Sequence, residues 1–345
     1  RSADWVERAL DKLGLTAFDA RKAEARDQAV SLTLEVSLEL LREDERARSS
    51  ELAIFPEDEA VPLQAVTRLW GTTGGMDDFE VEELCKRLFD LSLLRRFDPS
   101  KRTIELHDVV QDYLAQQLGE RLSTLHTRLL EAYAAACQHN ANGAPCWPTG
   151  PDDGYYFQHL AYHLWEAERR ERLRALLLSP DWLQAKLDLT DVIPLLTDYD
   201  VVLYHSKDKA LRLVQDAIRL SAHVLNQDKT QLWSQIYGRL MVHDLSEIQE
   251  MLNKPPETPW LRPLRPSLRH AGGALLRTLA GHSGPVKAVA VTPDGQRAVS
   301  ISKDKHSDEV SAEILTETLN VWDLERGVQS TPEVYSEVNA VAITP

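Results

Sequence analysis

The sequence lacks several features that mark common classes of protein. It has only three cysteines in 345 residues, Cys85, Cys137 and Cys146. Their odd number and the absence of Cys-x-x-Cys spacing argue against a disulfide framework and fit a reducing compartment. No apolar run approaches the roughly 20 residues that span a bilayer, and the first 30 residues are charged rather than a signal peptide. We therefore expect a cytoplasmic protein without a membrane span.

Basic residues are also scarce relative to acidic ones. The chain has 39 Lys and Arg against 54 Asp and Glu, which gives a net charge of -15. This balance disfavours general attraction to nucleic acid or to an anionic membrane, although local basic patches are compatible with it. The length and the 43% hydrophobic content predict two or three domains with their own cores. Arg1 in place of Met, in a stretch with helical periodicity, predicts a fragment of a longer protein.

The motifs of common active sites are missing from the sequence. There is no G-x-x-x-x-G-K-[ST] loop to cradle a phosphate, no H-E-x-x-H and no G-x-S-x-G. His159 and His163 have the i, i+4 spacing of metal ligands, but aromatic neighbours favour a packing face, and no third ligand is evident. Cys146 has no pattern of partner residues that would make it a nucleophile. We predict neither a catalytic site nor a metal site in this chain.

Three helices are predicted before residue 91. The first is the later of two helical stretches predicted in residues 1–41, which carry separate apolar stripes before and after Gly14, and it ends in a charged run at 42–46. The second has Pro62 in its first turn and turns Leu63, Val66 and Trp70 inward. The third begins at the capping pair Asp77-x-x-Glu80.

A hairpin and a fourth helix follow these three. Residues 93–97 and 102–106 are strand-like and flank Asp98-Pro99-Ser100, which is a strong turn signal. Asp108-x-x-Gln111 resembles a capping box, so the helix should begin at Asp108 with His107 just outside it. An imidazole beside a helix N-terminus can contact a phosphate, whereas the simpler alternative is a corner residue that packs. The whole pattern over residues 28–118 is typical of a winged helix.

The remaining chain changes from helical to strand periodicity. Residues 119–253 are predicted to be helical, for example where Ser179-Pro180 provides a cap and a first helical position. Prolines interrupt residues 254–274, which form either a linker or a packed extended connector. Residues 275–345 have the period of strands.

This last segment resembles a WD repeat. The markers Gly281-His282, Asp294-Gly295 and Trp322-Asp323 occur in order, and residues 338–345 repeat residues 286–293. Residues 305–318 resemble an acidic insertion in this blade. One blade cannot close a propeller, so we expect the segment to be an incomplete one.

Three motifs before residue 118 resemble a known family. Leu52-Ala-Ile-Phe-Pro-Glu-Asp, Pro62-Leu-x-x-Val-x-x-Leu-Trp and Leu106-His107-Asp108 occur in the order found in the winged-helix domain of NB-ARC (STAND) signal-transduction NTPases. The stretch from Tyr155 to Lys186 is similar to the helical arm that follows this domain in apoptotic members. The expected fold is mixed α and β and multidomain. Its parts are the end of a preceding helical domain (1–27), a winged helix (28–118), a helical arm (119–253), a Pro-rich linker (254–274) and the start of a WD-repeat propeller (275–345).

The resemblance implies a regulatory and sensor role. In that family the histidine at the position of His107 contacts the β-phosphate of bound ADP, whereas Leu106 stands where many members have Met. The parent protein is then expected to bind ADP or ATP with Mg²⁺ mainly through an upstream domain. It would be autoinhibited with ADP, recognise a protein or small molecule at the propeller, and form a homo-oligomer that activates an N-terminal effector. The sequence favours a bacterial defence or signalling protein.

Two alternatives from other classes stay open. A winged helix suggests a DNA-binding transcription regulator, but residues 25–118 hold 20 acidic residues against 11 basic ones, and the third helix is acidic. Nucleic acid is therefore an unlikely partner. The other alternative is a non-catalytic WD-repeat scaffold whose nucleotide function has been lost.

Overall fold

The computed structural model describes residues 34–57, 59–256, 259–274, 279, 286–306, 314–324 and 329–330. The chain divides into two compact units, Arg1–Leu173 and Arg174–Pro345. The predicted end of a preceding domain (1–27), the Gly281-His282 marker and the second repeat copy (338–345) lie outside the described residues. No helix in the described ranges is long and apolar enough to cross a membrane.

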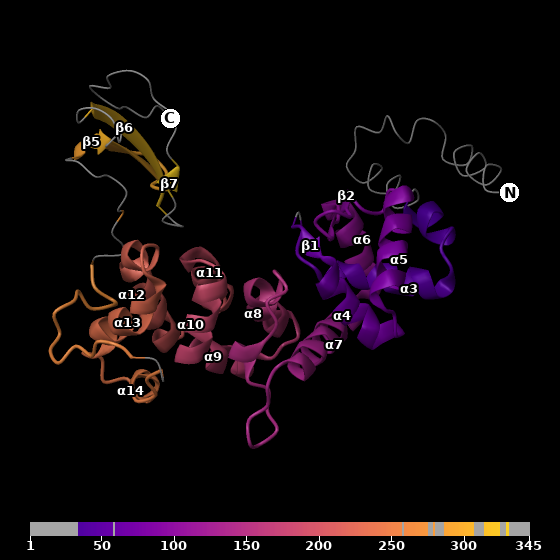
Figure 1. Ribbon diagram of the computed structural model, residues 1–345, viewed down its shortest axis with the longest axis horizontal. Helices are drawn as coiled ribbons and strands as arrows, with labels where there is room; N and C mark the ends of the chain where they lie inside the picture. The colour runs from indigo at the N-terminus through magenta and orange to yellow at the C-terminus, as the bar shows by residue number, and fades with distance from the viewer. Residues whose placement is uncertain are drawn as a thin grey trace. The chain divides into compact units, whose positions relative to one another are not determined.

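The first half of unit 1 contains helices around a small antiparallel sheet (Figure 1). Residues 34–39 are helical, and the helices that follow are α3 (Glu43–Glu51), the 3-10 turn η2 (Leu52–Ile54), α4 (Leu63–Gly74), α5 (Asp78–Asp90) and α6 (Asp108–Leu118). Its strands are β1 (Val61–Pro62), β2 (Arg96–Asp98) and β3 (Thr103–Glu105), in the order β1-β3-β2. Ile104 stands opposite both Val61 and Phe97, so the central strand anchors the sheet to the core.

The predicted second and third helices are confirmed. Leu63, Val66 and Trp70 of α4 are fully buried, although Pro62 precedes the helix as its N-cap instead of occupying the first turn. The α5 helix begins with a complete capping box. In it, Asp77 Oδ1 accepts from the Glu80 N–H at 2.9 Å, and Glu80 Oε2 accepts from the Asp77 N–H at 3.0 Å.

The charged run at 42–46 was placed wrongly at the end of a helix. It is the start of α3, because Arg42 is the N-cap and its N–H donates to Glu45 Oε2 at 2.9 Å. Glu43, Asp44 and Glu45 fill the first turn, where negative charge interacts favourably with the helix dipole. The run is therefore the start of a helix. The charges alone did not show whether a helix begins or ends there.

The predicted hairpin is present with shorter strands. The turn is fixed by Asp98 Oδ1, which accepts from Ser100 N–H at 3.0 Å and Lys101 N–H at 3.1 Å, and Arg102 has a positive φ of 52°. The sheet also contains β1, a strand that the sequence did not predict. Two residues with a proline are too short to show strand alternation, and β1 is recognisable only through its pairing with β3.

Helices make up the rest of both units before the second sheet. The unit 1 helices are α7 (Arg121–Ala136), the 3-10 turn η3 (Trp147–Thr149) and α8 (Tyr156–Glu166), with α9 (Arg170–Leu177) at the division. The unit 2 helices are α10 (Pro180–Leu189), α11 (Val192–Leu203), α12 (Lys209–Leu225), the 3-10 turn η4 (Lys229–Gln231), α13 (Leu232–Leu240) and α14 (Ser246–Leu252). The Ser179 cap with Pro180 in the first turn of α10 is confirmed.

The segment predicted as a linker or packed connector is a packed connector where it is described. Trp260 lies against Trp233 and Tyr237 of α13, with ring centroids 6.0 and 5.2 Å away. Arg239 of α13 donates from Nη1 to the Arg269 carbonyl at 3.0 Å. These contacts hold the proline-rich chain along α13 even though it has no regular structure.

The C-terminal sheet has the order β4-β5-β6-β7 and is antiparallel throughout. Its strands are β4 (Val286–Val291), β5 (Arg297–His306), β6 (Ile314–Asp323) and β7 (Gln329–Ser330). The turn between β4 and β5 contains the predicted Asp294-Gly295, where Gly295 has a φ of 70°. Trp322 Nε1 donates to Ser300 Oγ at 2.6 Å in the buried face between β5 and β6.

Candidate functional site

His107 lies at the N-cap of α6, directly after β3. Its backbone is extended (φ -79°, ψ 141°), its side chain is exposed, and it caps no helical N–H. Within the described part of the chain its imidazole makes no hydrogen bond or ion pair. The side chain is therefore available to a group from outside this chain.

The α6 helix begins at Asp108 with His107 just outside it, as predicted, but the predicted capping box between Asp108 and Gln111 does not form. The N-cap is His107, and Asp108 Oδ1 accepts only from the adjacent Val109 N–H at 2.7 Å. Gln111 instead donates from Nε2 to the carbonyls of Phe55 at 2.6 Å and Ala53 at 3.3 Å. This buried amide fixes the first turn of α6 to the residues around η2, and it thereby positions His107.

The β2–β3 hairpin beside His107 carries basic side chains. Arg96 lies 3.4 Å from Glu105, and Arg102 lies 3.8 Å from Glu82 of α5. Water reaches the arginine of each pair, and the distances are long, so each pair contributes little to stability. They do reduce the positive charge that the hairpin could offer to a nucleic acid.

His159 and His163 both lie on α8, but their side chains contact different partners. His159 Nε2 is 2.8 Å from Glu59 Oε2, and its ring stacks on Tyr155 with centroids 4.3 Å apart. This hydrogen bond from His159 lowers the pKa of Glu59. In the described ranges no group of three His, Cys, Asp or Glu side chains is placed to hold a metal ion.

His163 belongs instead to a buried network of hydrogen-bonded side chains, which the sequence analysis did not predict. Its Nε2 is 2.8 Å from the Tyr155 hydroxyl, and its Nδ1 is 2.8 Å from His126 Nδ1 on α7. A neutral imidazole donates through one nitrogen and accepts through the other, so His163 satisfies both neighbours. Burial lowers the pKa of His126 to about 4 and holds the pKa of His163 well below its usual value. The only sequence signal was two histidines on the apolar faces of successive helices.

The cysteines show no catalytic arrangement. Cys146 is partly exposed beside η3, and Cys137 is buried with its Sγ 3.6 Å from the Tyr156 hydroxyl. Burial raises the pKa of Cys85, which is packed in α5. These surroundings disfavour the thiolate form of Cys85 that a nucleophile requires.

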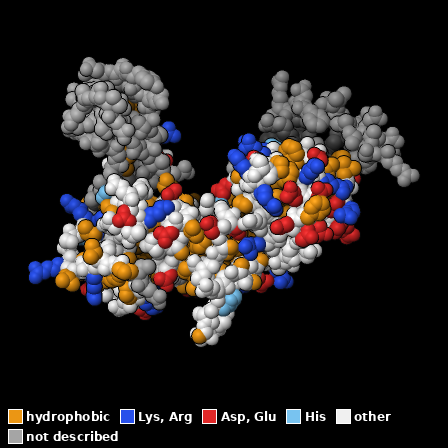
Figure 2. Space-filling view, viewed as in Figure 1, with side chains coloured by type: hydrophobic (Ala, Val, Ile, Leu, Met, Phe, Trp, Pro, Cys, Tyr) orange, Lys and Arg blue, Asp and Glu red, His pale blue; other side chains and the backbone are white. Residues whose placement is uncertain are grey.

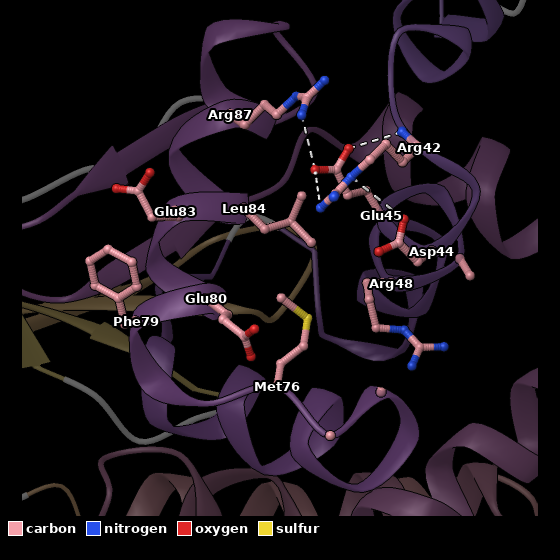
Figure 3. A pocket seen from close by; sticks show the side chains of 13 residues that line it. Arg42, Asp44, Glu45, Arg48, Met76, Phe79, Glu80, Glu83, Leu84 and Arg87 are labelled. Carbon is pink, nitrogen blue, oxygen red and sulfur yellow. Dashed lines mark hydrogen bonds and ion pairs between the residues drawn. The ribbon is translucent and has the colours of Figure 1, made fainter.

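A hollow of about 540 Å³ opens between α3, the end of α4 and the start of α5 (Figure 3). Figure 3 shows Glu45 between two arginines of this hollow: Glu45 Oε1 lies 2.9 Å from Arg87 and 3.1 Å from Arg42. Phe79 at its rim is 72% exposed. His107 does not line this hollow, and acidic side chains gather on the surface where α3 lies (Figure 2).

Arg48 lines the same hollow, and its side chain packs over Gly74. A Cβ added to Gly74 would lie 2.5 Å from Arg48 Nη1, so the guanidinium occupies the space of the missing side chain. Gly75, the next residue, ends α4 in the left-handed conformation with a φ of 67°.

Comparison with known proteins shows similarity to apoptotic protease-activating factor 1. Residues 122–236 match the family described as the APAF-1 helical domain. The chain is 27% identical to apoptotic protease-activating factor 1 of Homo sapiens over 297 residues, which cover 82% of this chain and 22% of that protein. It is 29% identical to the Mus musculus protein over 209 residues, which cover 59% of this chain and 16% of that protein.

These matches confirm the resemblance inferred from the Tyr155–Lys186 stretch, which lies inside the matched helical domain. They support an APAF-1-like signalling family for the chain. The chain spans about a fifth of the length of the curated relatives it matches. The predicted domain boundaries and the role of His107 stay predictions.

Proposed function

We propose that this chain is the regulatory and sensor part of a STAND protein that is switched by ADP and ATP. The similarity of residues 122–236 to the APAF-1 helical domain carries the proposal, because that domain is named for a protein of the same signalling class. The activating ligand is expected at the WD-repeat segment, and the active form is expected to be a homo-oligomer in the cytoplasm. The nucleotide with its Mg²⁺ would be held mainly by an upstream domain.

The arrangement before residue 118 supports a winged-helix domain. Helices α3, α4 and α5 precede the β2–β3 hairpin, and α6 follows it. The third strand β1 joins the hairpin just before α4, which gives a sheet order of β1-β3-β2. The second and third predicted helices, the hairpin and α6 occur in the predicted order, whereas α3 and β1 were not predicted.

The β4–β7 sheet supports the start of a WD-repeat propeller. It is a four-stranded antiparallel meander, as a propeller blade is. The buried Trp322 of the Trp-Asp marker donates to Ser300 on the neighbouring strand. The marker tryptophan therefore has a structural role in joining β5 and β6.

His107 is the residue through which the chain would report nucleotide state. It stands exposed at the N-terminus of an 11-residue helix, where backbone N–H groups and the helix dipole favour an anion. Bound ADP would supply the phosphate anion there, and His107 would donate a hydrogen bond to it. Gln111 would hold the first turn of α6 in place during this contact, because its amide is fixed to η2.

The test uses the full-length parent with its nucleotide-binding domain. His107→Ala should release ADP about tenfold faster or more, because a hydrogen bond to a charged group contributes about 1.5 to 3 kcal/mol. The matched control is His139→Ala, which removes an exposed histidine from the loop before η3. Release measured with a fluorescent ADP analogue should be unchanged in this control. Unchanged release in His107→Ala would sink the proposed role of His107.

A further inference from the structure

A second hollow in unit 1, of about 360 Å³, has a different character from that of Figure 3. It is lined by three arginines and three threonines from α3, α4 and α7: Arg48, Arg121, Arg128, Thr72, Thr73 and Thr124. The α4 and α7 helices pack side by side (Figure 1). A chain with a net charge of -15 therefore gathers guanidinium groups and hydroxyls around one cavity.

The α7 helix supplies half of these groups from one face. Arg121, Thr124 and Arg128 are spaced i, i+3 and i+7, which brings their side chains onto the same stripe of the helix. Arg121 is the first residue of this 16-residue helix, so the positive end of the helix dipole adds to the two arginines. The last turns of α4 close the other side with Thr72 and Thr73.

One carboxylate lines the hollow, and both of its oxygens already have partners. Glu51 is only 3% exposed, its Oε1 lies 2.7 Å from Arg48 Nη2, and its Oε2 accepts from the Thr73 hydroxyl at 2.6 Å. Glu51 therefore pairs directly with Arg48 and interacts at longer range with Arg121. Burial raises the pKa of Glu51.

The remaining donors have no strong internal partner. Arg121 and Thr124 make no hydrogen bond or ion pair within the ranges that the structure describes. Arg128 pairs at 3.2 Å with Glu131, but both side chains are more than half exposed, so water competes for that pair. Arg48 Nε is buried and lacks a partner among the described residues.

We infer that this hollow binds a phosphate group of a small molecule. The three arginines and the one carboxylate of the lining leave a net charge of two positive units, and a phosphate monoester carries close to two negative charges at pH 7. The phosphate oxygens point in several directions, so they can accept hydrogen bonds from donors placed around a hollow. The planar guanidinium group of arginine can donate two parallel hydrogen bonds to such oxygens. His107 is not part of the lining, so the inference does not depend on the proposed nucleotide sensor.

The experiment titrates the full 345-residue chain by calorimetry with inorganic phosphate and, separately, with glycerol phosphate. Sodium chloride at matched ionic strength is the reference. Saturable binding of one phosphate per chain is expected. Tighter binding of the ester identifies an esterified ligand, and equal binding identifies free phosphate.

Three variants assign the binding to this hollow. Arg121→Gln should weaken phosphate binding about tenfold, because it removes a charge-assisted hydrogen bond. Thr124→Val tests the hydroxyl without changing charge and should weaken binding by a smaller factor. The matched control Arg172→Gln removes an exposed arginine of α9 and should leave the affinity unchanged.

Two results would overturn the inference. One is the absence of saturable phosphate binding up to about 20 mM, well above the millimolar affinity of a single weak site. The other is equal weakening in Arg172→Gln and Arg121→Gln, since this would mean that only overall charge matters. Circular dichroism checks that the variants fold, and the exposed positions of Arg121 and Thr124 make unfolding unexpected.

Discussion

At the scale of single residues, Gln111 links the candidate site to the core. Its amide donates to two buried carbonyls near η2. Gln111→Ala should lower the free energy of unfolding by about 1 to 3 kcal/mol, because buried acceptors then lose their donor. Urea denaturation followed by circular dichroism measures this change.

The control for this prediction lies on the same helix. Gln116→Ala makes the same chemical change at an exposed position and should alter stability by less than about 0.5 kcal/mol. If both variants lose equal stability, the loss would come from the helix and not from the two hydrogen bonds.

Lys186 and Asp198 form a buried ion pair between α10 and α11 at 2.7 Å. The lysine is fully buried, and this burial lowers its pKa while Asp198 opposes the shift. Lys186→Met should cost about 3 to 5 kcal/mol, because the Asp198 carboxylate stays buried without that cation. Thermal unfolding and urea titration both report the change.

The double variant separates charge from packing. Lys186→Met with Asp198→Leu should recover most of the lost stability, since replacing both partners of a buried pair is often neutral. Lys209→Met, at an exposed position of α12, is the matched control and should be close to neutral. A double variant no more stable than Lys186→Met would contradict this account.

At the scale of elements, helix starts were predictable where the chain itself supplies the cap. The Asp77-x-x-Glu80 box is closed by residues three apart, so its spacing suffices. Asp108-x-x-Gln111 has the same spacing, but Gln111 bonds to carbonyls more than 50 positions earlier. The sequence contains no sign of these long-range hydrogen bonds, so the start of α6 at Asp108 was predicted correctly from a capping box that does not form.

The contact between α7 and α8 should depend on pH. Folding lowers the pKa of His126 from an ordinary 6.5 to about 4, so the unfolded chain binds more protons between these values. Stability is complete above pH 6.5 and falls as the pH drops toward 4. His126 alone accounts for about 3 kcal/mol of this loss, at about 1.4 kcal/mol for each pH unit, and the buried His163 adds to it. Urea denaturation at several pH values measures it.

A variant isolates this histidine from the carboxylates that also titrate in acid. His126→Gln should flatten the fall in stability between pH 6.5 and 4, whereas His139→Gln, at an exposed histidine, should leave it unchanged. An equal slope in the wild type and in His126→Gln would rule out His126 as its source.

At the scale of the whole molecule, the charge balance predicts weak binding to DNA. The net charge is -15, and α5 carries Asp78, Glu80, Glu82 and Glu83 in its first half. A mobility-shift assay at about 150 mM salt should show no duplex complex at about 10 µM chain, because few phosphates can be neutralised. Tight binding that falls steeply with salt and is lost in Lys101→Glu would favour the transcription-regulator alternative.

The parts of the candidate site differ in how far the sequence reveals them. His107 was found because a strand, a turn and a helix start meet within about ten residues of it. The hydrogen-bonded side chains of Tyr155, His163 and His126 come from separate helices. The arginines and threonines that line the second hollow also come from separate helices. Their members look like ordinary helix residues until the helices are packed, so periodicity cannot group them.

The packing of Arg48 over Gly74 constrains how this protein can change over evolution. Any side chain at position 74 would displace the guanidinium and with it the partner of the buried Glu51. Relatives with a larger residue at the position of Gly74 should therefore carry a shorter residue at that of Arg48 and an uncharged one at that of Glu51. The three positions are expected to covary as a group, although they belong to two different helices.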